Sequence, residues 1–457
     1  MISDTISNTV SDDANIILIG NGTLVTRDPD EPIIFDGCAA VRGNLIADRG
    51  KTAELKAKYP RHAFVDAAGG LIMPGLINTH THIYSAFARG MTLDGPPNRD
   101  FLQILENLWW RLDKALNLRD VEYSALTAYT ECIKNGVTTV FDHHASQRHV
   151  AGSLDVIAGA ARRLGVRASL CYEVSDRDGA ETAVAAIGEN ARFIRLAQAD
   201  GGDMIKGMFG LHASMTLSPD TLDNCLAANH GLNAGFHVHA AEGAQDLRDS
   251  LEKYGVPVVE RLYKAGVLGD KTIAAHCIHI GEGEMEILAD TKTAVAHNPE
   301  SNMGNAVGCA DVITMLERGV LVGLGTDGYT PDMLESFKCA GIIQKHVRRD
   351  ASAAWAEPSR MLFYNNRAIA GRYFNNPIGI IKNGAYADIV IAGYGAPTPV
   401  TAGNIDSHIL FGLNGRCVRD TMINGRFVVR NGAVTGLDER EVFAKSREQA
   451  ADFWASV

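Results

Sequence analysis

Apolar segments of strand length alternate with long segments of helical periodicity through the middle of the chain. The expected strands lie at residues 71–82, 137–143, 166–174, 204–213, 231–239, 272–279, 292–297 and 320–327. Strands that alternate with helices form βα units and a parallel sheet. Eight such strands in succession predict an α/β fold, specifically a (β/α)8 TIM barrel over residues 71–380.

Both ends of the chain show a different pattern, with short apolar strands interrupted by turn residues. It occurs at residues 14–70 and returns at 381–436, where Asn424-Gly425 is typical of a two-residue hairpin turn. We expect these segments to form one small β-sandwich domain built from both chain ends. Residues 437–457 are expected to form an amphipathic C-terminal helix, and the polar residues 1–13 a flexible N-terminal tail.

The composition fits a globular protein and narrows its partners. Of the 457 residues, 46% are hydrophobic, which allows a sizeable core. The formal net charge is -11 and no block of Lys and Arg occurs, which argues against nucleic acid or a membrane surface as the partner. A small uncharged or cationic molecule suits this charge better. No apolar run approaches the length of a membrane span.

Cysteine spacing and the N-terminal residues predict a cytoplasmic protein. Eight cysteines are scattered without CxxC spacing, which argues against a disulfide framework and against a thiolate zinc site. The first residues are polar and acidic, whereas a secretory signal peptide has a basic start and an apolar centre.

The first expected strand ends in His80 and His82. Side chains on a strand alternate faces, so residues spaced i, i+2 project to the same side and can present two imidazoles to one metal ion. The pair alone is a weak indication, but the other expected strands also end in polar residues, among them His143, Glu173, His212, His239, His276, His297 and Asp327. In a barrel the carboxyl ends of all strands meet at one face, where active sites lie.

A third imidazole is expected from "GFHVHAAEG", where His237 and His239 share one strand face. His239 is the better candidate, because it lies nearer the strand end and places Glu242 three residues beyond, within reach of a substrate. Asp327 follows an apolar run, and a buried carboxylate there is costly unless a charge such as a metal ion pairs with it. Zinc held by such ligands lowers the pKa of bound water and yields a hydroxide nucleophile.

Glu242 is the expected proton shuttle, and His276 is expected to polarise the attacked oxygen or hold the water, with His279 as the alternative. Tyr84 and Arg89 follow the first strand and are expected to contact the substrate from a flap. Trp109 and Trp110 follow helical spacing together with nearby leucines, which favours core or subunit packing over a stacking platform for the substrate.

The ordered motifs "PGLINTHTH", "HVHAAE", "AAHCIH", "AHNPESN" and "LGTDG" resemble the amidohydrolase superfamily, in the branch that contains cytosine deaminase, guanine deaminase and the triazine hydrolases. Within that branch, "GLINTHTHIYSAFARGM", "LENLWWRLDKAL" and "HNPESNMGNAVG" resemble the SsnA group of aminohydrolases. The resemblance extends over nearly the whole chain.

This resemblance implies a barrel with one zinc ion per subunit, or iron in some members, bound by His80, His82, His239 and Asp327. It implies that Glu242 and His276 form the acid/base pair, that Asp327 also accepts a proton, and that His212 contacts the substrate. Asn302 is expected to contact the substrate too, since it precedes a segment that would line the pocket. Two-metal relatives carry a lysine at the end of strand four, whereas Lys206 stands at the start of that strand here.

The predicted function is hydrolytic deamination of an aminated N-heterocycle of purine, pyrimidine or pteridine type, by a homo-oligomer. The alternatives are ring opening of a cyclic amide or ureide, chloride removal on the same scaffold, and a catalytically silent binding protein. A dehydrogenase is disfavoured although Gly323, Gly325 and Gly328 form a GxGxxG, because Pro331 interrupts the helix that should follow. The HxE and PCxxC signature of the other zinc deaminases is absent.

Overall fold

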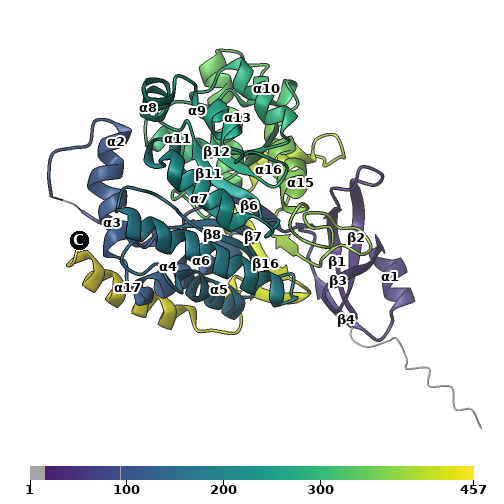
Figure 1. The fold of residues 1–457 in the computed structure, drawn as a ribbon. Coiled ribbons are helices and arrows are strands. Elements are labelled where there is room, and N and C mark those ends of the chain that lie inside the picture. The colour runs from purple at the N-terminus through teal and green to yellow at the C-terminus, as the bar shows by residue number, and fades with distance from the viewer. Residues whose placement is uncertain (1–15, 93) are drawn as a thin grey trace, which may run out of the picture.

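The computed structural model describes residues 16–92 and 94–457, so the expected tail at 1–13 lies outside the described residues. The described chain has a mixed α/β fold with two parallel sheets and one mixed sheet (Figure 1). The first parallel sheet consists of β6 (Leu76–Thr81), β7 (Val137–His144), β8 (Arg167–Tyr172) and β9 (Ile205–Gly207). The second consists of β10 (Phe209–Ala213), β11 (Phe236–Ala240), β12 (Ile273–His276), β13 (Ala294–His297) and β14 (Leu321–Leu324).

The two parallel sheets contact each other at both edges. Thr81 and Asp327 form a parallel bridge between β6 and the residues after β14, and the amides of Thr326 and Asp327 each donate to the carbonyl of His80 at 3.0 Å. At the other edge, Val174 bridges to Leu211. The predicted parallel βα architecture is therefore confirmed, while a continuously hydrogen-bonded closed barrel stays a prediction.

Two expected strands are each divided in the structure. Residues 71–82 form β5 (Leu71–Pro74) in the mixed sheet and β6 in the parallel sheet, and the chain changes sheets at Gly75. A Cβ at Gly75 would lie 2.2 Å from the Thr138 hydroxyl, so only glycine fits at this crossing. Residues 204–213 form β9 and β10, which lie in different sheets and are separated by Met208.

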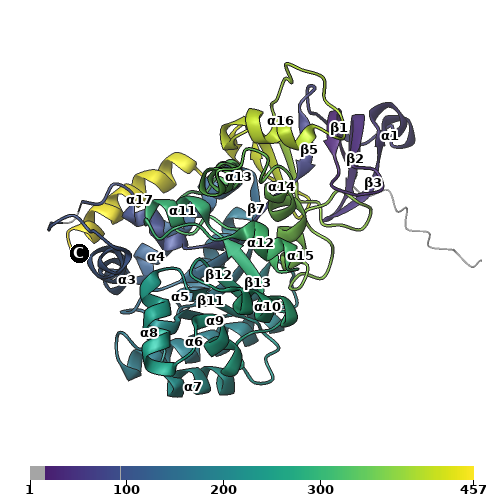
Figure 2. The same ribbon diagram turned by 90° about the horizontal axis from the view of Figure 1, so that it is seen from above.

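Helices cover the outside of the parallel strands in both views (Figures 1 and 2). Their ends follow local rules: α4 begins after Asn117, whose side chain accepts from the amides of Arg119 and Asp120. The longer helices are α4 (Leu118–Lys134), α5 (Ser153–Leu164), α6 (Ala180–Ala199), α7 (Pro219–Asn229), α8 (Ala244–Tyr254), α10 (Glu282–Asp290), α13 (Met333–Arg348) and α16 (Ile405–Gly412). Shorter ones are α1 (Thr52–Lys58), α9 (Val258–Lys264), α11 (Pro299–Gly304), α12 (Val312–Glu317), α14 (Glu357–Ser359) and α15 (Asn366–Ala370).

The mixed sheet has nine strands, which come from the N-terminal and the C-terminal parts of the described chain. Its strands are β1 (Ile16–Val25), β2 (Ile33–Arg42), β3 (Leu45–Lys51), β4 (Ala63–Asp66), β5, β15 (Ile389–Ala392), β16 (Val418–Ile423), β17 (Arg426–Arg430) and β18 (Ala433–Val434). The N-terminal and C-terminal strands join where β5 pairs antiparallel with β15. Asn424 and Gly425 form the β16–β17 turn with φ of 51° and 76°, as a type I′ turn requires. A second layer that would make a sandwich stays a prediction.

The C-terminal residues form α17 (Glu439–Trp454), which lies along α4 (Figures 1 and 2). Within the described part of the chain, no helix combines the length and the apolar character needed to cross a bilayer.

Candidate active site

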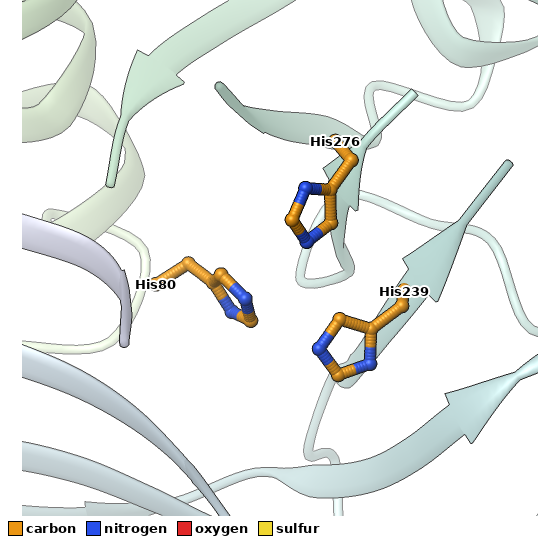
Figure 3. A group of neighbouring side chains, drawn as sticks. All are labelled: His80, His239 and His276. Atoms are coloured by element: carbon orange, nitrogen blue, oxygen red, sulfur yellow. The ribbon is translucent and has the colours of Figure 1, made fainter. Parts of the chain in front are cut away.

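Imidazoles from three strands meet at the carboxyl ends of the parallel sheets. His80 and its neighbour His82 end β6, His239 lies on β11, and His276 ends β12. Figure 3 shows the rings of His80, His239 and His276 turned towards one common space. His82 Nε2 lies 3.1 Å from His239 Nε2, and the rings of His80 and His239 are 5.1 Å apart. All four side chains are buried.

The strand that carries His80 is anchored by its own polar side chains. Asn78 donates to the Thr326 hydroxyl at 2.7 Å, and the Thr79 hydroxyl donates to the Leu324 carbonyl at 2.8 Å. Gly325 allows this close approach, since a Cβ there would lie 2.8 Å from the His80 carbonyl oxygen. The sequence therefore fixes β6 against β14, and this places His80 beside Asp327.

Asp327 completes the cluster. Its Oδ1 lies 3.2 Å from His82 Nε2 and 3.8 Å from His80 Nε2. Burial raises the pKa of this carboxyl, but His82, His276 and a 2.5 Å hydrogen bond from the Ser301 hydroxyl outweigh burial, so the pKa is below its ordinary value. An ionised carboxylate thus faces the imidazoles.

The strand ends at this site have unusual backbone conformations. Asp327 has φ of 54° and His276 has φ of 73°, in the left-handed region that residues with a Cβ seldom adopt. Such conformations persist only where the surrounding structure enforces them, and they concentrate at functional sites.

Backbone carbonyls and an amide orient the imidazoles. His82 Nδ1 donates to the His143 carbonyl at 2.6 Å and His239 Nδ1 donates to the His212 carbonyl at 2.8 Å. A carbonyl only accepts, so Nδ1 carries the proton and Nε2 keeps a free lone pair. His276 Nδ1 is held in the same way by Asn302 Oδ1, 2.8 Å away. This is the arrangement that prepares histidines to bind a metal ion.

The donor atoms fit a divalent metal ion. Among the described residues, the buried Nε2 atoms of His80 and His276 have no hydrogen-bond partner. Burial, with neighbouring histidines adding to it, holds the pKa of His80 well below its ordinary value, so this ring is neutral and able to ligate. Ligand atoms of His80, His82 and Asp327 all lie within 4.8 Å of one another, as do those of His80, His239 and His276. Imidazole nitrogens with one carboxylate are a donor set that suits zinc.

Glu242 lies two residues beyond the end of β11, next to this cluster. Its Oε2 is 3.5 Å from His276 Nε2, and its Oε1 is 3.5 Å from the Asn305 amide nitrogen. Burial raises the pKa of Glu242 well above its ordinary value, and the charge of Asp327 adds to this. The surroundings thus favour the protonated form of Glu242 and the ionised form of Asp327, which is how neighbouring carboxyls divide acid and base roles.

A cavity of about 880 Å³, measured to its open mouth, lies above these groups. Its inner end is formed by the candidate metal and proton-transfer residues His82, His239, Glu242 and Asp327. Its outer wall is largely aromatic and apolar and contains Phe101, Leu102, Leu105, Trp109, Trp110 and Met215. The cavity thus combines a polar floor with flat apolar walls, which suits a planar heterocycle.

The sequence profile described as "Amidohydrolase family" matches residues 71–428, which is most of the chain. The chain belongs to the amidohydrolase family. The predicted resemblance to this superfamily is confirmed, whereas the resemblance to the SsnA group stays a prediction.

Named relatives of this amidohydrolase are deaminases. The 5'-deoxyadenosine deaminase of Methanosarcina mazei is 31% identical over 445 residues, covering 96% of this chain and 99% of the relative. The 5-methylthioadenosine/S-adenosylhomocysteine deaminase of Pelotomaculum thermopropionicum is 30% identical, covering 95% and 98%. A crystal structure described as an adenosine deaminase from Xanthomonas campestris with bound zinc aligns with a TM-score of 0.86 and 25% identity, covering 96% and 99%.

Two of the expected substrate contacts of this amidohydrolase line the cavity, namely Tyr84 and His212. Arg89 does not: its guanidinium forms a two-pronged ion pair with Glu131 at 2.5 and 2.8 Å and borders a neighbouring space. Asn302 is buried, and its amide oxygen faces His276 instead of the cavity. Arg89 borders a space that also reaches His82 and Asp327, and Asn302 holds the His276 ring, so their roles as substrate contacts stay predictions.

The alternatives left open by the sequence have distinct positions. His237 Nε2 lies 2.9 Å from His80 Nδ1, behind that ring, and His279 Nε2 lies 3.0 Å from the Val307 carbonyl. Lys206 pairs with Asp203 at 2.5 Å on β9. His239 and His276 thus face the centre, while the alternatives do not.

A cluster of buried charges on the outer wall was not predicted as part of the site. Arg177 pairs with Asp113 on α3 (Trp110–Ala115) and with Glu173, which is 3.3 Å away. Asp113 and Glu173 both line the cavity. Glu173 was among the polar strand ends that the sequence predicted to meet at the active-site face, whereas Asp113 lies in a segment of helical periodicity where a charged residue gives no such signal. The tryptophans beside it also line the cavity, contrary to the preferred interpretation of pure packing.

Proposed function

We propose that this amidohydrolase is a zinc-dependent deaminase of an aminated N-heterocycle, and that its substrate is an adenine nucleoside without a 5'-hydroxyl group. The observation that carries the proposal is the buried cluster of imidazoles in which the carboxyls of Glu242 and Asp327 lie 3.5 and 3.8 Å from His276 Nε2, with the pKa of Glu242 raised and that of Asp327 lowered. The named relatives support the substrate class, since they are 5'-deoxyadenosine and 5-methylthioadenosine/S-adenosylhomocysteine deaminases.

His80, His82, His239 and Asp327 would hold one metal ion per subunit, zinc or, with the same donors, iron. When bound there, zinc lowers the pKa of a water molecule and makes it nucleophilic at neutral pH.

The residues around the centre can account for the proton transfers. Asp327, ionised, would accept a proton from the attacking water. Glu242, in its protonated form, would donate to the ring nitrogen next to the attacked carbon. His276 Nε2, which keeps a free lone pair because Nδ1 donates to Asn302, would accept a hydrogen bond from the attacking water and orient it. The proton on Asp327 would then pass to the amino group, the C–N bond would break, and ammonia would leave. The water oxygen stays on the carbon, and its remaining proton would return to Glu242, which gives the product carbonyl and restores the protonated acid.

The outer wall suits a ligand with hydroxyl groups. Asp113 and Trp110 line the cavity, and their buried atoms Asp113 Oδ1 and Trp110 Nε1 lack hydrogen-bond partners within the described chain. The carboxylate oxygen accepts and the indole N–H donates, so a sugar hydroxyl, which does both, could pair with them. This supports a nucleoside over a bare base.

The proposed architecture is a closed (β/α)8 barrel over residues 71–380, with a β-sandwich from residues 14–70 and 381–436. The bridges at both sheet edges support closure. We further propose a cytoplasmic homo-oligomer. The eight cysteines, all of them described and unpaired, support a reducing compartment.

The test is ammonia release by zinc-loaded protein from a panel of 5'-deoxyadenosine, 5-methylthioadenosine, adenosine, guanine, cytosine, a cyclic ureide and a chlorinated triazine. We expect stoichiometric ammonia from the adenine nucleosides and conversion of their adenine absorbance to that of hypoxanthine. Ring opening or chloride release without ammonia would instead favour the alternative hydrolase chemistries. Inactivity on the whole panel, with zinc bound, would contradict the proposal.

A further inference from the structure

The outer wall of the cavity is carried by one segment, which we name the roof segment: residues 83–92 and 94–115 as described. It contains the 3-10 helix η1 (Ile83–Ala88), α2 (Phe101–Ile104), the π-helix η2 (Leu105–Trp109) and α3. Tyr84, Phe101, Leu105, Trp110 and Asp113 of this segment all line the cavity. A shift of the roof segment would therefore change the shape of the substrate site.

Part of the roof segment has open space beneath it. A second cavity of about 920 Å³, measured to its open mouth, lies between η1 and α4. Its walls include Ile83, Ala86 and Arg89 on one side and Ala128, Tyr129 and Cys132 on the other. The exposed ion pair of Arg89 with Glu131 adds little, because such pairs contribute at most about 1 kcal/mol. Ile83, Tyr84 and Phe87 of η1 are buried in the core, whereas the side of η1 that faces this space is less closely packed, so further contacts of the roof segment can affect its position.

The end of α17 contacts the roof segment directly. The Trp454 indole N–H donates to the Phe87 carbonyl at 2.7 Å, and the Phe453 ring lies 6.0 Å from the Phe87 ring. Arg111 lies on α3 between the cavity-lining residues Trp110 and Asp113, and its guanidinium donates to the Val457 carbonyl at 2.6 Å. Both views show the end of α17 beside α3 (Figures 1 and 2).

The remainder of α17 is fixed to the barrel helix α4. The hydroxyls of Ser446 and Thr127 lie 2.7 Å apart, and Gln449 donates to Asp120 at 2.7 Å. Val442 and Phe453 are buried on the same side. One face of α17 packs against α4, and its C-terminal end contacts the roof segment. The helix can therefore hold the roof segment in a fixed position relative to the parallel strands.

We propose that α17 sets the position of the roof segment over the candidate active site, with Trp454 as the main positioning residue. This proposal rests on the proposed deaminase function for its kinetic consequence. Trp454 touches neither the cavity nor the candidate metal ligands, so its effect should fall on substrate binding. Trp454 is 38% exposed, so burial in the core does not by itself explain a tryptophan at this position.

The test compares Trp454→Ala, Trp454→Phe and Arg111→Met with the parent protein, using zinc-loaded full-length chains. Loss of one roof contact should raise KM for 5'-deoxyadenosine roughly fivefold to tenfold, on the scale of one hydrogen bond with its packing. The kcat should change less than about twofold, and zinc content should stay the same. Trp454→Phe keeps the ring and loses only the N–H, so its KM should lie between those of the parent and Trp454→Ala.

Trp355→Phe is the matched control. This indole is 54% exposed and also donates to a backbone carbonyl, that of Ala351 at 3.1 Å, but it is not part of α17 or the roof segment. Its KM should equal that of the parent. A KM unchanged in Trp454→Ala, or a kcat lowered as much as kcat/KM, would overturn the proposal.

Hydrogen exchange separates this proposal from the proposed function. Amides of residues 83–92 should exchange faster in Trp454→Ala than in the parent, and those of β6 and β11 should not change. Unchanged exchange at 83–92 would overturn the positioning role of α17 whether or not the protein deaminates nucleosides. Faster exchange in a protein that releases no ammonia would support the mechanical role and contradict only the proposed function.

Discussion

Glu242 Oε2 lies 3.5 Å from His276 Nε2, at the edge of the imidazole cluster, and Glu242 is not one of the four proposed metal ligands. A carboxyl in this position can reach a substrate atom without holding the metal ion. Its loss should therefore affect the chemical step and leave metal binding intact.

Glu242→Gln should lower kcat by roughly 10² to 10⁴, the range typical of general acid/base groups. Zinc content, measured by elemental analysis after gel filtration, should match that of the parent. Glu282→Gln is a suitable control, because Glu282 is an exposed residue paired with Arg318 away from the cavity. A Glu242→Gln protein with parental turnover would remove the proposed role of this residue.

Asp327→Asn should impair both metal retention and turnover. The substitution removes the negative charge that faces His80 and His82 and leaves a weaker ligand. We expect faster zinc loss during dialysis against a chelator and a smaller zinc-dependent rise in Tm. Ser301→Ala serves for comparison, since it removes only one hydrogen bond to Asp327 and should cause a smaller loss. Full zinc retention together with full activity in Asp327→Asn would refute the assignment.

Asn302→Ala should lower kcat roughly 10-fold to 100-fold, which is the loss typical when a residue that orients a ligand or a catalytic group is substituted. The reason is that Asn302 holds His276 Nδ1 at 2.8 Å and does not line the cavity. KM should stay within about threefold of the parent value, because no direct substrate contact is lost. A raised KM with an unchanged kcat would show instead that Asn302 contacts the substrate, as the sequence had predicted.

Glu300→Gln should change how stability depends on pH. Burial raises the pKa of Glu300 from 4.5 to about 7, with Glu335 and Asp332 adding to it and a hydrogen bond from Ser336 opposing it. Since the folded pKa is above the unfolded one, the folded state binds more protons between about pH 4.5 and pH 7, and stability falls as pH rises through that window. The Glu300→Gln protein has no carboxyl that titrates at this position, so its stability should not fall through that pH window.

Chemical denaturation at several pH values measures this effect. At pH 8 the Glu300→Gln protein should be more stable than the parent by about 1 to 2 kcal/mol, after allowance for partial exposure of the side chain. At pH 4 the two proteins should differ by less than about 0.5 kcal/mol, since Glu300 is protonated in both states there. An equal difference at both pH values would contradict the raised pKa.

Several features of the candidate site could be predicted from the sequence because they depend on local pattern. The i, i+2 spacing of His80 and His82 at the end of an apolar strand requires both rings to face the same side. Asp327 follows another apolar strand, and the parallel order of the strands brings its carboxyl to the same edge of the sheets as His239. Strand periodicity and topology together were enough to bring these side chains to one centre.

Other features depend on contacts between distant segments and needed the tertiary structure. Whether Asn302 faces the cavity or His276 depends on how α11 packs against β12, and Arg89 is drawn away by Glu131 on a separate helix. The cavity-lining role of Trp110 depends on the fold of the roof segment, since helical spacing reports that one face is apolar but not what covers it.

The sequence by itself thus determined which strands carry imidazoles and carboxylates at their ends, because alternation along a strand is a local property. Only the tertiary structure decided which side chains form the cavity wall, where the chain passes between sheets at Gly75, and that α17 reaches the roof segment. These outcomes follow from packing between residues far apart in the chain, and no local pattern encodes such contacts.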